Sequence, residues 1–259
     1  MPDALVRTRG LCKHFGGVVA TDNVTLELNR GEIHAVIGPN GAGKTTLINQ
    51  LTGELFPDAG SILLDGRDIT REPPAVRARA GLARAYQIVS IFPAFSVLQN
   101  VALAVQATQP HSFRFWREAA RDARLLDPAM EILARLGLEG RAGALASQLS
   151  HGEQRQLELA MALATRPRVL LLDEPTAGMG HEESRHIVSL LGTLKSDYAI
   201  LLVEHDMNAV FALADLITVL VYGRIVASGA PDEIRGDAEV KRAYLGEKKK
   251  APRRTGAAD

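Results

Sequence analysis

The sequence has one cysteine, no net charge and no long apolar run, and each absence excludes a class of protein. Cys12 has no second cysteine to pair with, which excludes a domain held together by disulfides within the chain. A membrane-spanning helix needs ~18 apolar residues, whereas the richest apolar runs are strand-length: Val169–Leu172, Ala199–Val203 and Leu216–Tyr222. Residues 1–10 carry arginines, but no apolar stretch of signal-peptide type follows them. These absences predict a cytosolic protein that reaches a membrane only through a partner.

The charges cancel overall but are unevenly distributed. Lys and Arg number 30, as do Asp and Glu, which argues against a nucleic-acid-binding protein because such proteins usually carry a basic excess. A hydrophobic content of 46% argues against disorder. The tail 247–259 and the segment 71–124, with its eight arginines and three acids, are basic, so the rest of the chain is acidic. Arginines in such a segment either solvate helix faces or mark a docking side.

Strand-like and helix-like stretches alternate along most of the chain. Expected strands cover 4–8, 18–19, 24–28, 32–37, 61–64, 169–172, 199–203, 216–222 and 225–228, and expected helices cover 45–55, 153–164, 182–194 and 207–213. Residues 113–138 read as mostly helical, with an interruption where Asp127 would cap a new helix that begins at Pro128. The alternation predicts an α/β protein with a largely parallel sheet, followed by a flexible tail at 248–259.

A glycine-rich loop follows the expected strand at 32–37. Gly38–Thr46 reads GPNGAGKTT, which fits the phosphate-loop pattern G-x-x-x-x-G-K-[ST]. Glycines allow backbone N–H groups to turn inward as an anion-binding nest, and the N-terminus of the next helix adds positive potential. Lys44 would place its charge on the β- and γ-phosphate oxygens, and Thr45 would offer a hydroxyl to Mg²⁺.

Two carboxylates, Asp173 and Glu174, stand at the end of the buried strand in VLLLDE (residues 169–174). Because ligands lie at the carboxyl edge of open α/β sheets, Asp173 is expected at a ligand site, in the Mg²⁺ shell. Glu174 suits a general base that polarises the attacking water. Two capping acids after a strand would be the plain alternative, which the phosphate loop in the same chain disfavours.

The segment Leu149–Gln154 reads LSHGEQ and directly precedes a helical run. Ser150 and Gly152 at a helix start offer a hydroxyl and free N–H groups, which suit a phosphate. Taken locally, the stronger interpretation is a capping box in which Ser150 is the N-cap and Glu153 its partner three residues later.

These motifs, in this order and followed by His205 after the strand AILLV, resemble the ATP-binding subunits of ABC transporters over about residues 5–246. The resemblance implies a single ABC domain at 1–247. It would contain a mostly parallel sheet, an N-terminal antiparallel β subdomain and a helical subdomain at about 88–150. It also implies ATP and Mg²⁺ as ligands and ATP hydrolysis as the activity.

The resemblance also assigns roles to single residues. Phe15 would stack on adenine, Gln87 would contact Mg²⁺ and the attacking water, and His205 would contact the γ-phosphate. Catalysis would then involve Glu174, His205 and Gln87, and Mg²⁺ would be held by Thr45, Gln87 and Asp173. The nucleotide-binding residues would be Phe15, Gly38, Pro39, Asn40, Gly41, Ala42, Gly43, Lys44, Thr45, Thr46, Ser150, Gly152 and Glu153.

Members of the family act in head-to-tail pairs, which implies a second ATPase subunit, identical or paralogous, as a partner. Ser150 and Gly152 of one subunit would close over ATP bound at Lys44 of the other. His151 and Glu153 depart from the usual LSGGQ, and Gly180 stands where many relatives have aspartate. The phosphate-facing Ser150 and Gly152 are kept, and the change at Gly180 puts cross-dimer coupling at that loop in doubt, but not ATP binding.

The sequence VEHDM, the AGM after Glu174, the ending VKRAYLGE and the insert near 111–128 resemble ATPases of branched-chain amino-acid importers, a group that includes urea and amide relatives. This implies two membrane permease subunits, an indirect link to a solute-binding protein, no nucleic acid, and a peripheral location on the cytoplasmic face of the cell membrane. A lipopolysaccharide-export ATPase is one alternative and a soluble repair or translation ATPase another.

A coupling helix of the permease would dock between Gln87 and Ser150. We expect the apolar cluster Ile88, Val89, Ile91, Phe92 and Phe95 either to line that groove or to form subdomain core. Part of the basic segment 71–124 would lie beside the groove, facing partner acids or anionic lipid head groups.

Overall fold

The computed structural model describes residues 4–85, 91–109, 122–238, 240 and 242. A six-stranded sheet at its centre has the order β11-β10-β4-β9-β8-β7. Its five parallel strands are β4 (Ile33–Ile37), β7 (Leu82–Ala85), β8 (Val169–Asp173), β9 (Ala199–Val203) and β10 (Leu216–Val221), and β11 (Arg224–Gly229) is an antiparallel edge strand. The largely parallel sheet expected from the sequence is therefore confirmed.

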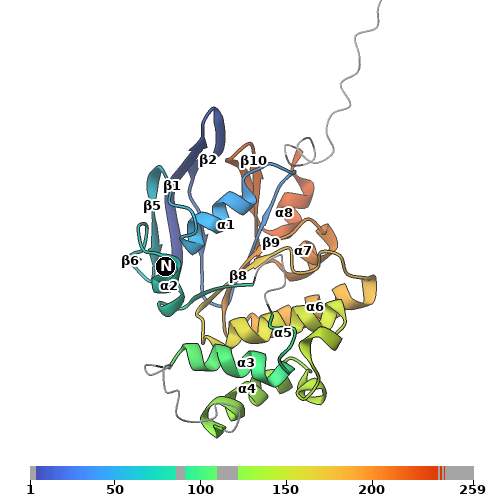
Figure 1. Ribbon diagram of the computed structural model, residues 1–259. Coiled ribbons are helices and arrows are strands. Elements are labelled where there is room, and N and C mark those ends of the chain that lie inside the picture. The colour runs from blue at the N-terminus through green and yellow to red at the C-terminus, as the bar shows by residue number, and fades with distance from the viewer. Residues whose placement is uncertain (1–3, 86–90, 110–121, 239, 241, 243–259) are drawn as a thin grey trace, which may run out of the picture.

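A second, antiparallel sheet forms from the N-terminal part of the chain (Figure 1). It contains β1 (Val6–Phe15), β2 (Val18–Val24), β3 (Glu27–Leu28), β5 (Ala59–Leu64) and β6 (Arg67–Asp68). The Asp65-Gly66 turn joins β5 and β6, with both residues at positive φ. This sheet is the antiparallel β unit that the resemblance implied.

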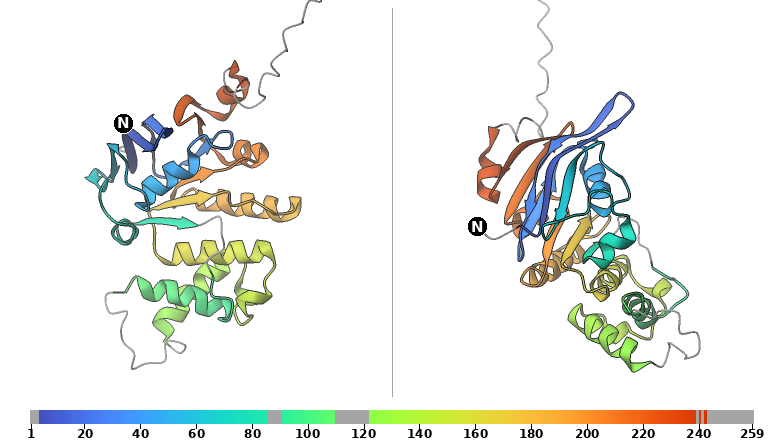
Figure 2. Two further views of the ribbon diagram at one scale, coloured as in Figure 1. Left: turned by 45° about the horizontal axis from the view of Figure 1, so that its top comes forward. Right: turned by 90° about the vertical axis from the view of Figure 1, so that its left-hand side faces the viewer.

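Helices cover both faces of the parallel sheet. They are α1 (Lys44–Thr52), α2 (Pro74–Arg79), α3 (Val97–Ala107), α4 (Ala123–Arg135), α5 (His151–Ala164), α6 (His181–Leu194), α7 (Met207–Leu213) and α8 (Pro231–Gly236), with short 3-10 turns at Glu139–Arg141 and Ala146–Gln148. Helices α3, α4 and α5 pack together below the sheets (Figures 1 and 2). None of the helices in the described ranges is long and apolar enough to cross a bilayer.

The alternation of side chains along β8 separates two cores. Leu170 and Leu172 share one apolar cluster with residues of α3, α4, α5 and α6. Val169 and Leu171 share the other cluster with α1 and the antiparallel sheet. Because successive strand residues face opposite ways, α1 and α5 lie on opposite faces of the parallel sheet.

The helix break expected at Asp127-Pro128 is wrong. Helix α4 runs through both residues, and the side chain of Asp122 caps it by accepting a hydrogen bond from the Arg124 N–H. Pro128 removes one backbone donor, but Leu125, Ala129 and Leu133 are buried on one face, so packing of this amphipathic face holds the helix together.

Two arginines of the basic segment serve the interior rather than the surface. Arg77 is fully buried and donates to the carbonyls of Gln50, Leu51, Thr70 and Glu72, and its burial lowers the pKa to about 10. The side chain of Arg84 is only 9% exposed and forms ion pairs with Glu54 and Asp173. Neither fits a role in solvating helix faces or in attracting lipid head groups.

Candidate functional site

The phosphate loop connects β4 to α1 at the carboxyl edge of the parallel sheet. Gly43 has φ 103 at the N-cap of α1, and a Cβ there would collide with the Ala20 carbonyl, so glycine is required. Lys44 begins the helix, as the motif predicts, and its Nζ donates to the carbonyls of Gly38 (2.7 Å) and Pro39 (3.2 Å). The Lys44 ammonium is thereby folded back over the loop, whose N–H groups would hold phosphate.

Asp173 and Glu174 lie at the end of β8, beside this loop. Asp173 is buried, and Glu174 has φ 49, a left-handed conformation that costs a non-glycine residue ~1–3 kcal/mol. The Glu174 N–H donates to the Val203 carbonyl at 2.8 Å, and this hydrogen bond anchors the turn to β9. Burial lowers the pKa of Lys44, while the carboxylates of Glu174 and Asp173 oppose that shift. Both carboxylates therefore lie close enough to the Lys44 ammonium to interact with it electrostatically.

His205 completes this edge of the sheet. Its Nδ1 lies 3.7 Å from the Glu174 Oε2, and its side chain is 60% exposed. The structure thus brings together Glu174, the expected base, and His205, on the loops after two neighbouring parallel strands, β8 and β9.

Sequence reasoning missed Glu204, the residue between β9 and His205. Its fully buried carboxylate accepts hydrogen bonds from the N–H groups of Thr176 (3.0 Å), His205 (2.8 Å) and Asp206 (3.2 Å), and from the Thr176 hydroxyl. Glu204 therefore joins the loop after Glu174 to the loop that carries His205. A carboxylate after the apolar run AILLV was the available signal.

Phe15 lies at the end of β1, paired with Val18 across the hairpin turn. Its ring is half exposed, and the Lys13 Nζ lies 5.8 Å from the ring centroid. The same hairpin brings the Ala20 carbonyl against Gly43 of the phosphate loop. The ring therefore stands free on the hairpin that borders the loop, an arrangement that allows stacking on a nucleobase.

The LSHGEQ segment lies on the opposite side of the parallel sheet from the phosphate loop. Ser150 caps α5 and forms a capping box with Glu153, whose carboxylate accepts the Ser150 N–H at 2.8 Å. Gly152 is buried, and a Cβ there would press on the Glu183 carboxylate. Because α5 and α1 lie on opposite faces, one chain does not bring Ser150 to its own Lys44.

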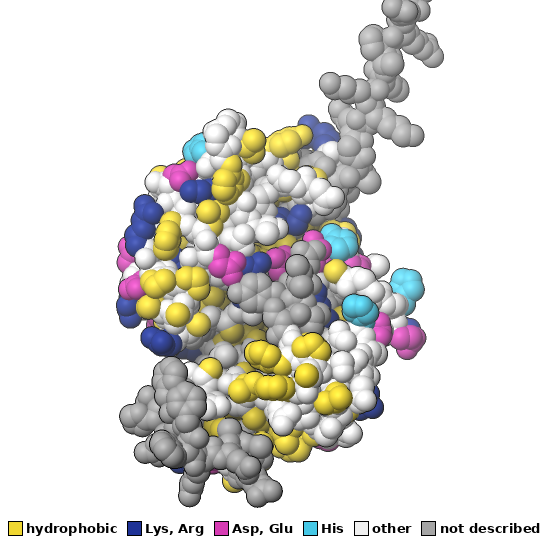
Figure 3. Space-filling view, in the orientation of Figure 1, with side chains coloured by type: hydrophobic (Ala, Val, Ile, Leu, Met, Phe, Trp, Pro, Cys, Tyr) yellow, Lys and Arg dark blue, Asp and Glu magenta, His cyan; other side chains and the backbone are white. Residues whose placement is uncertain are grey.

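Gln87 lies outside the described residues, and so do Ile88 and Val89, the first two members of the expected apolar cluster. Ile91 packs against the helical core, whereas Phe92 and Phe95 are exposed and stack with ring centroids 5.5 Å apart. Hydrophobic side chains gather over α3 in the space-filling view (Figure 3). The cluster is thus divided between subdomain core and open surface.

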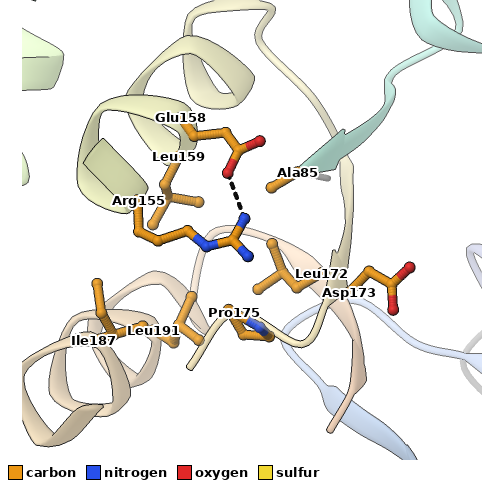
Figure 4. A pocket seen from close by; sticks show the side chains of 9 residues that line it. All are labelled: Ala85, Arg155, Glu158, Leu159, Leu172, Asp173, Pro175, Ile187 and Leu191. Carbon is orange, nitrogen blue, oxygen red and sulfur yellow. Dashed lines mark hydrogen bonds and ion pairs between the residues drawn. The ribbon is translucent and has the colours of Figure 1, made fainter. Parts of the chain in front are cut away.

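A surface groove of about 370 Å³ opens between α2, α3 and α5. Its lining combines apolar residues, five of them alanines, with two threonines and three charged residues: Thr52, Glu54, Pro74, Ala78, Leu82, Ala83, Arg84, Ala104, Ala107, Glu158, Met161, Ala162 and Thr165. Behind it lies a smaller cavity bounded by Asp173 and the buried Arg155–Glu158 ion pair (Figure 4). Glu158 borders both spaces, so little protein separates the groove from Asp173.

The donor set at the sheet edge fits Mg²⁺. Asp173 would supply a carboxylate oxygen and Thr45, at the start of α1, a hydroxyl oxygen, and both are the kind of hard ligand that Mg²⁺ prefers. Within the described ranges no three His, Cys, Asp or Glu side chains cluster as a cage.

Two family models match the sequence. The model for ABC transporters matches residues 21–177, and that for the branched-chain amino acid ATP-binding cassette transporter matches residues 224–250. The chain is similar to the high-affinity branched-chain amino acid transport ATP-binding protein LivG of Salmonella typhimurium. They are 41% identical over 95% of this chain and 100% of LivG.

Solved structures agree with this assignment. The ADP conformation of MJ1267, an ATP-binding cassette of an ABC transporter, is 30% identical, with a TM-score of 0.84 over 94% of this chain and 99% of that one. The ATP-binding cassette MJ0796 was solved as a dimer in a post-hydrolysis state with ADP and Pi. It is 26% identical, with a TM-score of 0.72 over 87% of this chain and 98% of that one.

Proposed function

The chain belongs to the ABC transporter family of ATP-binding proteins, and from this premise we propose that its hydrolysis of ATP powers an importer of branched-chain amino acids or related amides and urea. The match of the C-terminal segment favours this branch over a lipopolysaccharide exporter or a soluble ATPase. The observation that carries the chemistry is the placement of Glu174 beside Asp173, with His205 3.7 Å from Glu174.

The chain's own groups have distinct tasks in hydrolysis. N–H groups of the loop 38–43 and the Lys44 ammonium bind the phosphates, and Phe15 stacks on adenine. Glu174 accepts a proton from the attacking water. The oxygen of that water bonds to the γ-phosphorus while the bond from the γ-phosphorus to the β–γ bridging oxygen breaks, so ADP leaves. His205 contacts the γ-phosphate. Mg²⁺, held by Thr45, Asp173 and Gln87, would neutralise charge on the phosphates.

A second subunit completes the site. Ser150, Gly152 and Glu153 at the start of α5 lie on the face of the sheet opposite to α1, so they close over ATP bound to a partner chain. The dimer of MJ0796 with ADP and Pi supports such pairing in the family. Closure would exclude water from the reacting phosphate, and the pair would separate after hydrolysis.

The groove between α2, α3 and α5 receives a segment of a membrane permease subunit. It is open at the surface, and its small side chains (Ala78, Ala104 and Ala107) leave room for a helix. Phe92 and Phe95 extend the apolar surface near α3. The subunit therefore works on the cytoplasmic face of the cell membrane, next to two permease subunits and indirectly to a solute-binding protein.

Replacement of the proposed base tests this function. Glu174→Gln keeps the shape of the side chain but cannot accept the proton, so we expect ATP to bind and turnover to fall by at least about 100-fold. The variant should also accumulate as an ATP-bound dimer, measured by size-exclusion chromatography with ATP. Lys44→Ala serves as the contrast, because it should weaken nucleotide binding itself. Turnover at the wild-type rate in Glu174→Gln would overturn the assignment.

A further inference from the structure

Arg84 connects the two elements that carry the oxygen ligands proposed for Mg²⁺. Arg84 is the second-last residue of β7, and its Nη2 donates to the Asp173 Oδ2 at 3.0 Å. Its Nη1 donates to the Asn49 Oδ1 of α1 at 2.8 Å. Asn49 lies four residues after Thr45, which places both on one face of α1. One guanidinium therefore ties the helix of Thr45 to the strand of Asp173.

Glu54 holds this guanidinium in place and balances its charge. The Glu54 Oε2 accepts from the Arg84 Nη1 at 2.8 Å. The side chains of Arg84 and Asp173 are 9% and 4% exposed, so water screens their ion pair little. Since the Glu54–Arg84 pair has no net charge, it can orient Asp173 without cancelling the negative potential that attracts a cation.

We propose that Arg84 is a positioning residue for the Mg²⁺ site, which fixes the Asp173 carboxylate relative to Thr45. Its hydrogen bond occupies one carboxylate oxygen, Oδ2, and leaves Oδ1 to face the Mg²⁺ shell. Residues that orient metal ligands in this way typically change metal affinity by about 10- to 100-fold when they are replaced. The inference rests on the proposed function, because that function makes Asp173 and Thr45 the Mg²⁺ residues.

The test is the Mg²⁺ dependence of ADP binding, measured calorimetrically on the purified chain in EDTA and at stepwise Mg²⁺ concentrations. Arg84→Met should raise the half-saturating Mg²⁺ concentration by about 10-fold and leave ADP affinity in EDTA unchanged. Arg84→Lys keeps the charge but lacks the planar fork that reaches both Asn49 and Asp173. It should therefore show a smaller increase of the same kind.

Arg168→Met is the matched control. Arg168 immediately precedes β8 and pairs with Asp65, so it forms an ion pair at the opposite end of the strand that ends in Asp173. Its replacement should leave the Mg²⁺ dependence at the wild-type value. A purely structural role of Arg84 would lower the thermal midpoint without moving the Mg²⁺ dependence, and this outcome in the folded Arg84→Lys variant would overturn the inference.

Asp173→Asn separates this inference from the proposed function. If Asp173→Asn raises the half-saturating Mg²⁺ concentration and neither Arg84 variant does, only the positioning role fails. If wild-type protein binds ADP equally with and without Mg²⁺, and Asp173→Asn changes nothing, the proposed Mg²⁺ site itself fails.

Discussion

Two fully buried charged side chains, Glu204 and Arg77, are held largely by backbone groups. Glu204 accepts from three backbone N–H groups and one hydroxyl, and Arg77 donates to four carbonyls. A buried charge without such partners would cost several kcal/mol. These residues therefore fix the path of the surrounding loops, because any shift of a loop would remove a hydrogen bond from a buried charge.

His34 predicts a pH dependence of stability. The ring is buried, and its Nδ1 donates to the Glu27 carbonyl, so Nε2 accepts from the Thr218 hydroxyl in the neutral form. Burial lowers the pKa of His34 from 6.5 despite the nearby Glu32. The unfolded chain therefore binds the proton first as pH falls. Stability should be full above pH 6.5 and decrease below it, by at most ~1.4 kcal/mol per pH unit from this residue.

Urea unfolding between pH 5 and pH 7.5 measures this effect. In His34→Gln the amide can still donate to the Glu27 carbonyl but does not titrate, so its free energy of unfolding should change less with pH than that of the wild type. Equal slopes for the two proteins would show that His34 does not carry the dependence.

The sequence could predict those site residues whose placement is local. Lys44 is predicted by a glycine-rich loop between a strand and a helix, and Asp173 and Glu174 by the end of a buried strand. Each of these two signals lies within about ten consecutive residues. Arg84 and Glu204 were not predicted because their partners are distant in sequence: Asp173 is 89 residues from Arg84, and Thr176 is 28 residues from Glu204. Only the fold brings such pairs together.

At the scale of elements, apolar runs and turns predicted the long regular pieces of the sheet. Strands β4, β8 and β9 and helices α5 and α6 lie within a residue or two of their expected positions. Helices α2 and α3 and strand β7 were not predicted, because residues 71–107 are rich in alanine and arginine and lack a clear hydrophobic periodicity. A local signal for α3 was present in Ser96 and Gln99, which form a capping box.

Pro128 offers an element-scale prediction. It lies inside α4, where it removes the N–H that would bond to the Arg124 carbonyl, whereas Pro231 is the first residue of α8, where that N–H has no partner in the helix. Pro128→Ala should therefore raise the free energy of unfolding by about 1–3 kcal/mol. Pro231→Ala, the matched control, should leave it unchanged or lower it. A fall in stability for Pro128→Ala, measured by thermal or urea unfolding, would contradict this account of α4.

At the scale of the whole molecule, the neutral charge is a sum of parts with separate roles. Arg77 and Arg84 belong to the interior, so the basic character of 71–124 is not a measure of its surface. Because α1 and α5 lie on opposite faces, the proposed pairing would bring the start of α5 to the phosphate loop of a second subunit. The groove between α2, α3 and α5 is the surface that we propose for the membrane partner.

Filling this groove tests whether it receives the permease. Ala78 is an exposed residue of α2 that lines the groove, and Ala75 is exposed on the same helix but is not part of the lining. An indole at position 78 would occupy the space of the docked segment. Overfilling a packed contact costs ~1–3 kcal/mol, so Ala78→Trp should weaken assembly with the permease subunits by about 10-fold or more. Ala75→Trp should assemble normally.

Co-purification with the membrane subunits measures assembly, and ADP binding by the purified chains verifies that both variants keep the nucleotide site. Arg84 and Glu54, the lining residues that connect the groove to Asp173, are unchanged in both variants, so ADP affinity should match the wild type in both. Normal assembly and transport with Ala78→Trp would place the permease elsewhere, for which the exposed Phe92 and Phe95 offer the next surface to replace with alanine.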